Sequence, residues 1–245
     1  MLKDVRTGNI FKRDNIKPLA LDLCCGKGGW TNGLLAAGYQ VIGVDIEDMG
    51  DYTGFLLLAD VKTLDVKIFK GMKFDLVVAS PPCQEFSYRS FPFKKCRELA
   101  KNVPPDKTIW QACERIAREL NTPLVLENVR GAQPYMGKAQ NHYGSFYLWG
   151  AVPALLPTGR PRKGFKNDPA NKNWQGNCQA GKKFGWNAEA IQQERTCKCV
   201  DKSHSRTGSK TSARKEWSAK IAMIPIELST WVGYCFKPKK KSKIK

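Results

Sequence analysis

The sequence predicts one α/β domain with a mostly parallel sheet, interrupted late in the chain by a small, basic and irregular insert. Up to about residue 150, short apolar runs rich in β-branched residues alternate with helical patterns, which is typical of parallel strands joined by helices. After Pro157 this alternation stops, and residues 158–216 are dominated by Gly, Lys, Arg, Asn and Ser. A chain of 245 residues, 42% of them hydrophobic, is long enough for one large core and a small appendage.

The first predicted unit is a strand, a glycine-rich turn, a helix and a second strand. These elements comprise residues 18–24, 25–29, 30–37 (ended by Gly38) and 40–45. Glycines let a backbone approach a ligand closely, and an acid at the end of the second strand binds ribose hydroxyls in Rossmann-type folds. The pattern therefore predicts a nucleotide-like cofactor between the turn and Asp45.

The next two predicted strands each lead into chemically useful side chains. Residues 55–60 end in Asp60, and residues 74–78 lead into Ala79-Ser80-Pro81-Pro82-Cys83-Gln84-Glu85-Phe86-Ser87. The two prolines stop the strand because neither can donate a ladder hydrogen bond. Cys83 is therefore expected at the carboxyl end of a core strand, where open α/β sheets bind their ligands.

Residues 88–105 form a basic loop, which we expect to lie over the site near Cys83 and to contact phosphates. A helix and a fifth strand follow this loop. The apolar stripe of the helix consists of Ile109, Ala112, Cys113, Ile116, Ala117 and Leu120, at helical spacing. The strand, residues 122–129, carries Glu127 and Asn128 at its end. Because a crossover helix places parallel strands side by side, Cys83 and Glu127 are expected to share one edge of the sheet.

The chain is expected to divide into four parts. A catalytic and cofactor-binding domain spans 1–157; it starts with a loose arm at 1–17 and ends with a sixth strand at 143–149. The basic insert spans 158–216. A part at 217–236 holds the terminal helix, which has Pro225 at its first position and packs back on the domain. A disordered tail at 237–245 holds six lysines.

Charge and cysteine usage indicate the partner and the compartment. The net charge is +19; residues 1–130 carry 19 Lys/Arg and 16 Asp/Glu, whereas residues 131–245 carry 22 and 6. This asymmetry predicts a nearly neutral catalytic half and a half that grips nucleic acid. Nine cysteines, an odd count, and no apolar leader favour free thiols in the cytoplasm of a bacterial or phage-infected cell. No apolar run is long enough to span a membrane.

One group of residues in the insert invites a zinc interpretation. It consists of Cys178, Cys197, Cys199 and His204. Strong zinc sites contain a Cys-x2-Cys pair, and this spacing lacks one. No metal is predicted, although the sequence leaves zinc binding at this group open.

Several of these segments, in this order, resemble motifs of the cytosine-5 DNA methyltransferases, in particular the small phage-type members. Residues 22–29 are similar to the cofactor loop of that family, with Cys24 where an aromatic residue is usual. Residues 81–87 resemble its nucleophile motif, Glu127-Asn128-Val129 its Glu-Asn-Val motif, and residues 224–233 its closing helix. The Gln-x-Arg-x-Arg motif, whose arginine contacts cytosine in the family, is not evident, and the insert takes the place of the large target-recognition domain.

The resemblance implies a Rossmann-like, S-adenosylmethionine-dependent methyltransferase fold and a set of site residues. Catalysis falls to Cys83 as nucleophile and Glu127 as acid. The implied contacts to S-adenosylmethionine are Asp22, Gly26, Gly28, Gly29, Asp45, Ile46, Asp60, Val61 and Pro81. The implied contacts to the substrate are Pro82, Gln84, Ser87, Asn128 and Val129. No metal is implied.

The implied reaction is methyl transfer to C5 of a cytosine flipped out of double-stranded DNA, by a monomer, as part of restriction-modification or phage DNA methylation. Carbon 5 is a poor nucleophile, and a thiolate that adds to C6 makes it reactive. The base cannot be reached inside a duplex, so it must be flipped. Two alternatives stay open from the sequence: a tRNA cytosine-5 methyltransferase, and a DNA-binding protein without activity on the same fold.

Overall fold

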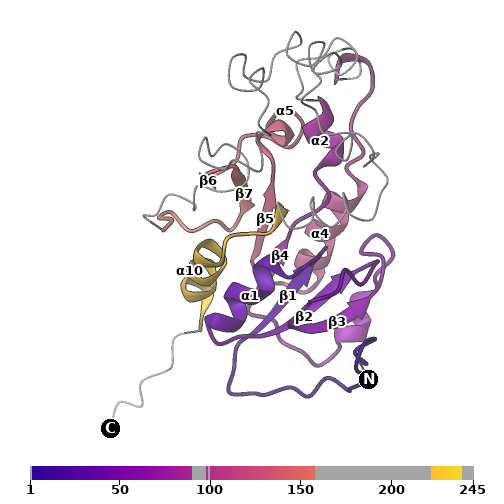
Figure 1. The fold of residues 1–245 in the computed structure, drawn as a ribbon, viewed down its shortest axis with the longest axis vertical. Helices are drawn as coiled ribbons and strands as arrows, with labels where there is room; N and C mark the ends of the chain where they lie inside the picture. Colours follow the sequence, from indigo (N-terminus) through magenta and orange to yellow (C-terminus); the bar gives the residue numbers. More distant parts are fainter. Residues whose placement is uncertain (1, 90–97, 99, 158–221, 239–245) are drawn as a thin grey trace, which may run out of the picture. The chain divides into compact units, whose positions relative to one another are not determined.

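A computed structural model describes residues 2–89, 98, 100–157 and 222–238 (Figure 1). The chain divides into two units. The first comprises Met1–Ser87, Pro105–Gly159 and Met223–Lys245, and the second comprises Tyr88–Pro104 and Arg160–Ala222. The predicted insert at 158–216 and nearly all of the lysine-rich tail lie outside the described residues, as do the cysteines and the histidine of the zinc interpretation.

The first unit is built on a seven-stranded sheet in the order β3-β2-β1-β4-β5-β7-β6. The strands are β1 (Leu19–Leu23), β2 (Gln40–Asp45), β3 (Phe55–Leu58), β4 (Leu76–Ala79), β5 (Leu124–Asn128), β6 (Asn141–Tyr143) and β7 (Phe146–Gly150). The first five pair in parallel, and β7 runs antiparallel to both β5 and β6. The predicted α/β class with a mostly parallel sheet is confirmed.

The expectation of a single sixth strand at 143–149 is wrong. The segment is the closing half of a hairpin, in which Tyr143 of β6 pairs with Phe146 of β7. The chain reverses between them at Gly144, whose φ of +61° is a left-handed conformation that glycine adopts without strain. A hairpin turn can consist of only two residues. So short a turn is hard to recognise within the largely apolar run of residues 143–149.

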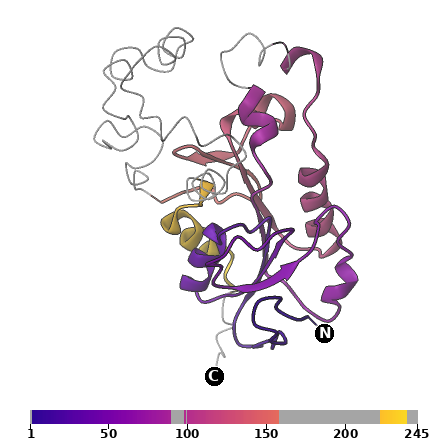
Figure 2. The same cartoon turned by 45° about the vertical axis from the view of Figure 1, so that its right-hand side comes forward.

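Helices cover both faces of the sheet (Figures 1 and 2). They are α1 (Gly29–Ala36), α2 (Gln84–Arg89), α4 (Thr108–Glu119), α5 (Gln133–Met136) and α10 (Ile226–Phe236), with 3-10 turns η1 (Val66–Phe69) and η2 (Arg130–Ala132). Alternate strand residues enter opposite cores, because side chains along a strand point to opposite faces. Leu19 and Leu21 lie in the core under α4, whereas Ala20 lies in the core under α1 and α10.

The terminal helix α10 packs directly on α1. A Cβ atom added at Gly33 of α1 would lie 1.9 Å from the Ser229 hydroxyl oxygen of α10, so only glycine fits between the two helices. Pro225 has an extended backbone and precedes the first turn as the N-cap, so its expected place at the first helical position is off by one residue. Among the described residues, no helix is long and apolar enough to cross a membrane.

The N-terminal segment is not the loose arm that its polarity predicts. Asp4 is 3% exposed and accepts hydrogen bonds from the backbone N–H groups of Leu56 (2.8 Å) and Thr7 (3.1 Å). Arg6 forms an ion pair with Asp4 (2.9 Å) and also donates to the carbonyl of Gly54 (2.6 Å) and to that of Tyr52. These partners lie about fifty residues away, so no local pattern could reveal them.

Candidate active site

The glycine-rich turn between β1 and α1 is fastened to the end of β2. Gly26 and Gly28 have φ values of +50° and +80°, which residues other than glycine rarely adopt. Asp45 Oδ2 accepts the Gly26 N–H (2.8 Å), and Asp45 Oδ1 accepts the Glu47 N–H (3.3 Å). The acid predicted to bind ribose therefore also closes the glycine-rich turn.

Asp22 lies wholly buried beneath this turn. Its Oδ2 atom accepts hydrogen bonds from the hydroxyl (2.7 Å) and the N–H (3.2 Å) of Thr31 on α1. In the part of the chain that the structure describes, its Oδ1 atom is the one buried side-chain nitrogen or oxygen without a hydrogen-bond partner. Burial raises the pKa of Asp22 to about 7; the bonds from Thr31 lower it and the charge of Asp45 adds to the rise.

Tyr52 supports the turn from below, and nothing in the sequence pattern singled it out. Its hydroxyl forms a 2.6 Å hydrogen bond with the Thr31 hydroxyl, and burial raises its pKa. Three glycines leave room for its ring: a Cβ at Gly28, Gly43 or Gly54 would lie 3.1, 2.4 or 2.9 Å from a ring carbon. The ring thus fills the space that side chains at these three positions would occupy. It packs the loop after β2 against the glycine-rich turn between β1 and α1.

The turn after β3 presents Asp60. Asp60 Oδ1 accepts the Lys62 N–H (2.9 Å), and the Asp60 carbonyl accepts the Thr63 N–H (3.1 Å). Val61, a predicted cofactor contact, has a side chain that is only 4% exposed and packs in the core. Ile46, another predicted contact, is 71% exposed beside Asp45. The carboxyl ends of β2 and β3 thus offer an exposed apolar side chain and two carboxylates.

The Cys83 loop leaves β4 and is held by its neighbours on both sides. The Ser80 hydroxyl accepts the indole N–H of Trp30 on α1 (2.9 Å). The carbonyl of buried Pro81 accepts the amide N–H of Asn128 (2.9 Å). The Cys83 carbonyl accepts the N–H groups of Phe86 and Ser87 (3.1 and 2.8 Å), so Cys83 immediately precedes α2, in whose first turn Gln84 and Ser87 lie.

Glu127 and Asn128 end β5, the parallel neighbour of β4. Cys83 and Glu127 therefore share the carboxyl edge of the sheet, as predicted. Glu127 is 9% exposed. Asn128 is 1% exposed, and its Oδ1 accepts the N–H of Val129 (2.9 Å). The structure thus places Asn128, expected to contact substrate, as the tie between the Glu127 strand and the Cys83 loop.

Aromatic packing anchors the start of α2. The Phe86 ring is 2% exposed and lies 6.1 Å from Trp110 of α4 and 6.2 Å from Tyr135 of α5. Trp110 in turn packs edge-to-face on Trp149 of β7 at 5.1 Å. The predicted stripe on α4 did not include Trp110, although it is one of the most buried residues of that helix. The cluster fixes the direction in which the chain leaves Cys83.

About half of the chain matches the model of a known protein family. Residues 20–140 match the model of the C-5 cytosine-specific DNA methylase family. The match begins in β1 and ends before β6, so it contains the cofactor turn, the Cys83 loop and Glu127. Comparison with curated proteins gives no significant match.

Solved structures that resemble the chain include three methyltransferases. One is described as a DNA modification methyltransferase encoded within a prophage of E. coli, with 24% identity and a TM-score of 0.36. The others are a DNMT2 mutant from Spodoptera frugiperda, with 22% identity and a TM-score of 0.35, and the methyltransferase EhMeth from Entamoeba histolytica, with 16% identity and a TM-score of 0.38. Each match covers 49% of this chain, and it covers 35%, 38% and 41% of the three proteins in that order. The chain thus spans well under half the length of these proteins.

The family match agrees with the strand order and with the positions of the motifs. A parallel sheet that ends in an antiparallel hairpin, with helices on both faces, is the Rossmann-like fold of S-adenosylmethionine-dependent methyltransferases. The cofactor of such a domain is S-adenosylmethionine. Residues 20–140, which carry the candidate site, are therefore similar to the C-5 cytosine-specific DNA methylases.

Proposed function

We propose that this protein transfers a methyl group from S-adenosylmethionine to C5 of cytosine in DNA, through a covalent bond between Cys83 and C6. The observation that carries the proposal is the 2.9 Å hydrogen bond from Asn128 to the Pro81 carbonyl. It joins the loop of the candidate nucleophile to the strand of the candidate acid, inside the segment that matches the family. The bond ties the two segments together at the carboxyl ends of β4 and β5.

The residues around the glycine turn fit the cofactor. Asp22 offers a buried carboxylate oxygen without a partner, which suits the ammonium group of the methionine portion. Asp45 and Asp60, at the ends of adjacent strands, would hold the ribose and the adenine, and Ile46 would cover the ring. Gly26, Gly28 and Gly29 would let the backbone approach the cofactor. When bound, S-adenosylmethionine supplies an electrophilic methyl group on a sulfonium.

The chain's own residues supply the activation of the base. The Cys83 sulfur, as thiolate, forms a bond to C6, and the electrons of the C5–C6 double bond become available at C5. The Glu127 carboxyl donates a proton to N3 and so neutralises the charge that develops on the ring. C5 then receives the methyl group and the sulfonium becomes a neutral thioether.

The second half of the reaction restores the base. Water or hydroxide removes the proton from C5, and that electron pair re-forms the C5–C6 double bond. Cys83 leaves as a thiolate, and Glu127 takes back the proton from N3. Pro82, Gln84, Ser87 and Val129 lie on the same two segments and would contact the flipped cytosine.

The charge of the chain supports a polyanionic substrate. Residues 131–245 carry 22 Lys/Arg against 6 Asp/Glu, far more than solubility requires. If these groups contact phosphates, affinity for nonspecific duplex should fall with salt, with a log–log slope of about −0.9 for each contacted phosphate. A salt-independent affinity would contradict this use of the charge.

The deciding experiment is transfer of tritiated methyl from S-adenosylmethionine to unmodified duplex DNA and, in parallel, to tRNA. The expected result is label in duplex DNA that maps to 5-methylcytosine and is absent with Cys83→Ala. Label in tRNA alone would show that the substrate is tRNA and would leave the proposed reaction at C5 unchanged. Label at an exocyclic amine in place of C5 would overturn the proposal.

A further inference from the structure

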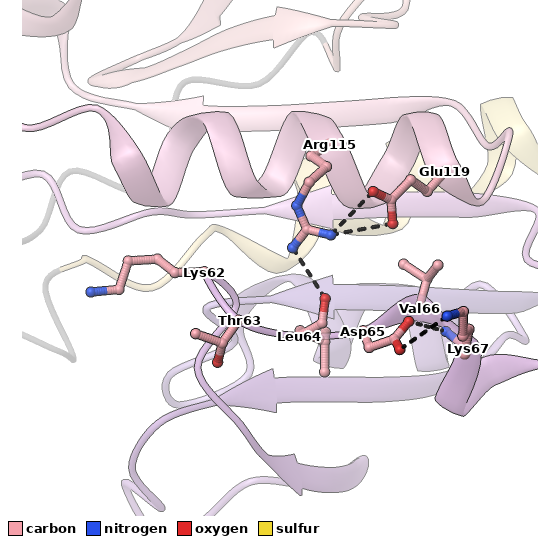
Figure 3. A pocket seen from close by; sticks show the side chains of 8 residues that line it. All are labelled: Lys62, Thr63, Leu64, Asp65, Val66, Lys67, Arg115 and Glu119. Carbon is pink, nitrogen blue, oxygen red and sulfur yellow. Dashed lines mark hydrogen bonds and ion pairs between the residues drawn. The ribbon is translucent and has the colours of Figure 1, made fainter.

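A surface pocket of about 660 Å³ lies between α4 and the chain that follows β3 (Figure 3). Its lining residues are Lys62, Thr63, Leu64, Asp65, Val66, Lys67, Arg115 and Glu119. The lysines lie near acids: Lys62 is 3.6 Å from Asp60 and Lys67 is 3.9 Å from Asp65. The informative member of the pocket is Arg115, because its guanidinium crosses from the helix to the loop.

Arg115 binds two backbone carbonyls of one turn. Its Nη2 atom donates to the carbonyl of Val61 (3.2 Å) and to that of Leu64 (3.1 Å). Its Nη1 atom donates to both carboxylate oxygens of Glu119 one helical turn later (3.3 and 3.2 Å). Figure 3 shows the side chain lying between Glu119 and Leu64. The planar guanidinium can serve both partners together, which a lysine ammonium cannot do with the same geometry.

The turn that Arg115 holds is the one that presents Asp60. Val61 and Leu64 are 4% and 6% exposed, so their side chains enter the core while their carbonyls point to Arg115. The N–H groups of Lys62 and Thr63 bond back to Asp60. The position of the Asp60 carboxylate is therefore fixed through the turn, and the hydrogen bonds of Arg115 tie the carbonyls of this turn to α4.

We propose that Arg115 is a positioning residue for the adenine end of the cofactor site. It acts through the carbonyls of Val61 and Leu64 and sets the distance and direction of the Asp60 carboxylate toward the adenine amino group. This inference rests on the proposed function, because it assumes that Asp60 faces the adenine. Arg115 itself does not touch the cofactor.

The test measures affinity for S-adenosylhomocysteine and for its analogue in which purine replaces adenine, so that the 6-amino group is missing. Calorimetry is done on the wild-type chain, Arg115→Lys and Arg115→Ala, with Arg118→Ala as the matched control, because Arg118 is exposed on the same helix. The expected result is about a tenfold loss of affinity for S-adenosylhomocysteine in the Arg115 variants, on the scale of a lost hydrogen bond to a charged group. The affinity for the purine analogue should change little, and Arg118→Ala should match wild type.

A double-mutant cycle separates positioning from general loosening of the fold. In an Asp60→Ala background, Arg115→Lys should have no further effect on S-adenosylhomocysteine, because the group that Arg115 positions is gone. Equal losses for both ligands, or additive losses in the cycle, would overturn the inference. If the wild-type chain bound neither ligand, the proposed function would fail as well; if wild type bound and the Arg115 variants bound equally well, only this inference would fail. Arg115→Lys keeps the charge and most of the packing, so the test holds even if Arg115→Ala does not fold.

Discussion

The two halves of the candidate site are held in place in different ways. On the cofactor side, the acids themselves make the structural hydrogen bonds: Asp45 to Gly26, Asp22 to Thr31 and Asp60 to Lys62. On the side of the nucleophile, residues other than Cys83 and Glu127 hold the loop, namely Trp30 through Ser80, and Asn128 through Pro81.

The difference has a consequence for mutagenesis. Removing an acid on the cofactor side changes the ligand contact and the backbone together. Near Cys83, the groups proposed for chemistry can be changed while their supports stay, and the supports can be changed while the chemistry stays. This side therefore allows chemistry and positioning to be measured separately.

The largest effect among these comparisons is expected for Glu127→Gln. The amide keeps the shape of the side chain but cannot supply a proton to N3, so transfer should slow by about 10²–10⁴-fold, the usual range for a positioned acid. Cofactor affinity should not change, because Glu127 ends β5, which β1 and β4 separate from β2. Single-turnover kinetics with labelled cofactor measure this. Glu227→Gln, on the exposed face of α10, is the control, and an equal loss there would contradict the role of Glu127.

A smaller effect on the rate is expected for Asn128→Ala. The substitution leaves the buried Pro81 carbonyl and the Val129 N–H without their partner, so the Cys83 loop loses its tie to β5. Each unpaired buried group costs about 1–3 kcal/mol of unfolding free energy. We expect both a lower midpoint in urea and about a 10–100-fold lower kcat, on the scale of a group misplaced near the chemistry. A loss of stability with unchanged kcat would show that the tie is not needed for positioning.

On the cofactor side, affinity for S-adenosylmethionine should rise as pH increases from 6 to 7. The folded-state pKa of Asp22 is raised to about 7, so the carboxyl gains its charge over this interval. The cofactor's amino group stays protonated there, since α-amino groups titrate near about 7.7–8.0. At pH 6 affinity should be about fivefold weaker than at pH 7, because a carboxyl with a pKa of about 7 is about one-tenth ionised at pH 6 and about half ionised at pH 7.

Calorimetry in two buffers of different ionisation enthalpy measures the coupled proton. Binding near pH 6.5 should release a proton, and Asp22→Asn should abolish that release. The same group should make the ligand-free protein less stable as pH rises from about 4 to 7, because folded Asp22 keeps a proton that the unfolded chain has lost above a pKa of about 3.9. A pH-independent affinity would contradict the assignment of Asp22 to the cofactor's ammonium group.

The elements that the sequence predicted well are those with a local pattern. The run that became β2 was predicted with its observed bounds, and the stripe through Cys113 and Ile116 identified α4. The carboxyl-edge location of Cys83 and Glu127 followed from the alternation of strands and helices alone.

The features that were missed depend on contacts far apart in the sequence. Asp4 and Arg6 bind the chain near Leu56, and Tyr52 fills a space made by three separate glycines. Arg115 is an ordinary exposed-face residue in the helical pattern, and only the fold places two carbonyls within its reach. Such residues have no spacing signature, because their partners are set by the packing of whole elements.

The most direct test of the account is the covalent adduct with duplex DNA that contains 5-fluorocytosine, in the presence of S-adenosylmethionine. Fluorine at C5 cannot leave as a proton does, so the bond between cysteine and C6 persists through denaturation. Wild type and Cys235→Ala, which changes an exposed cysteine on α10, should both give the adduct on a denaturing gel. Cys83→Ala should give none while it still binds S-adenosylhomocysteine. An adduct with Cys83→Ala, or none with wild type that binds both DNA and cofactor, would contradict Cys83 as the nucleophile.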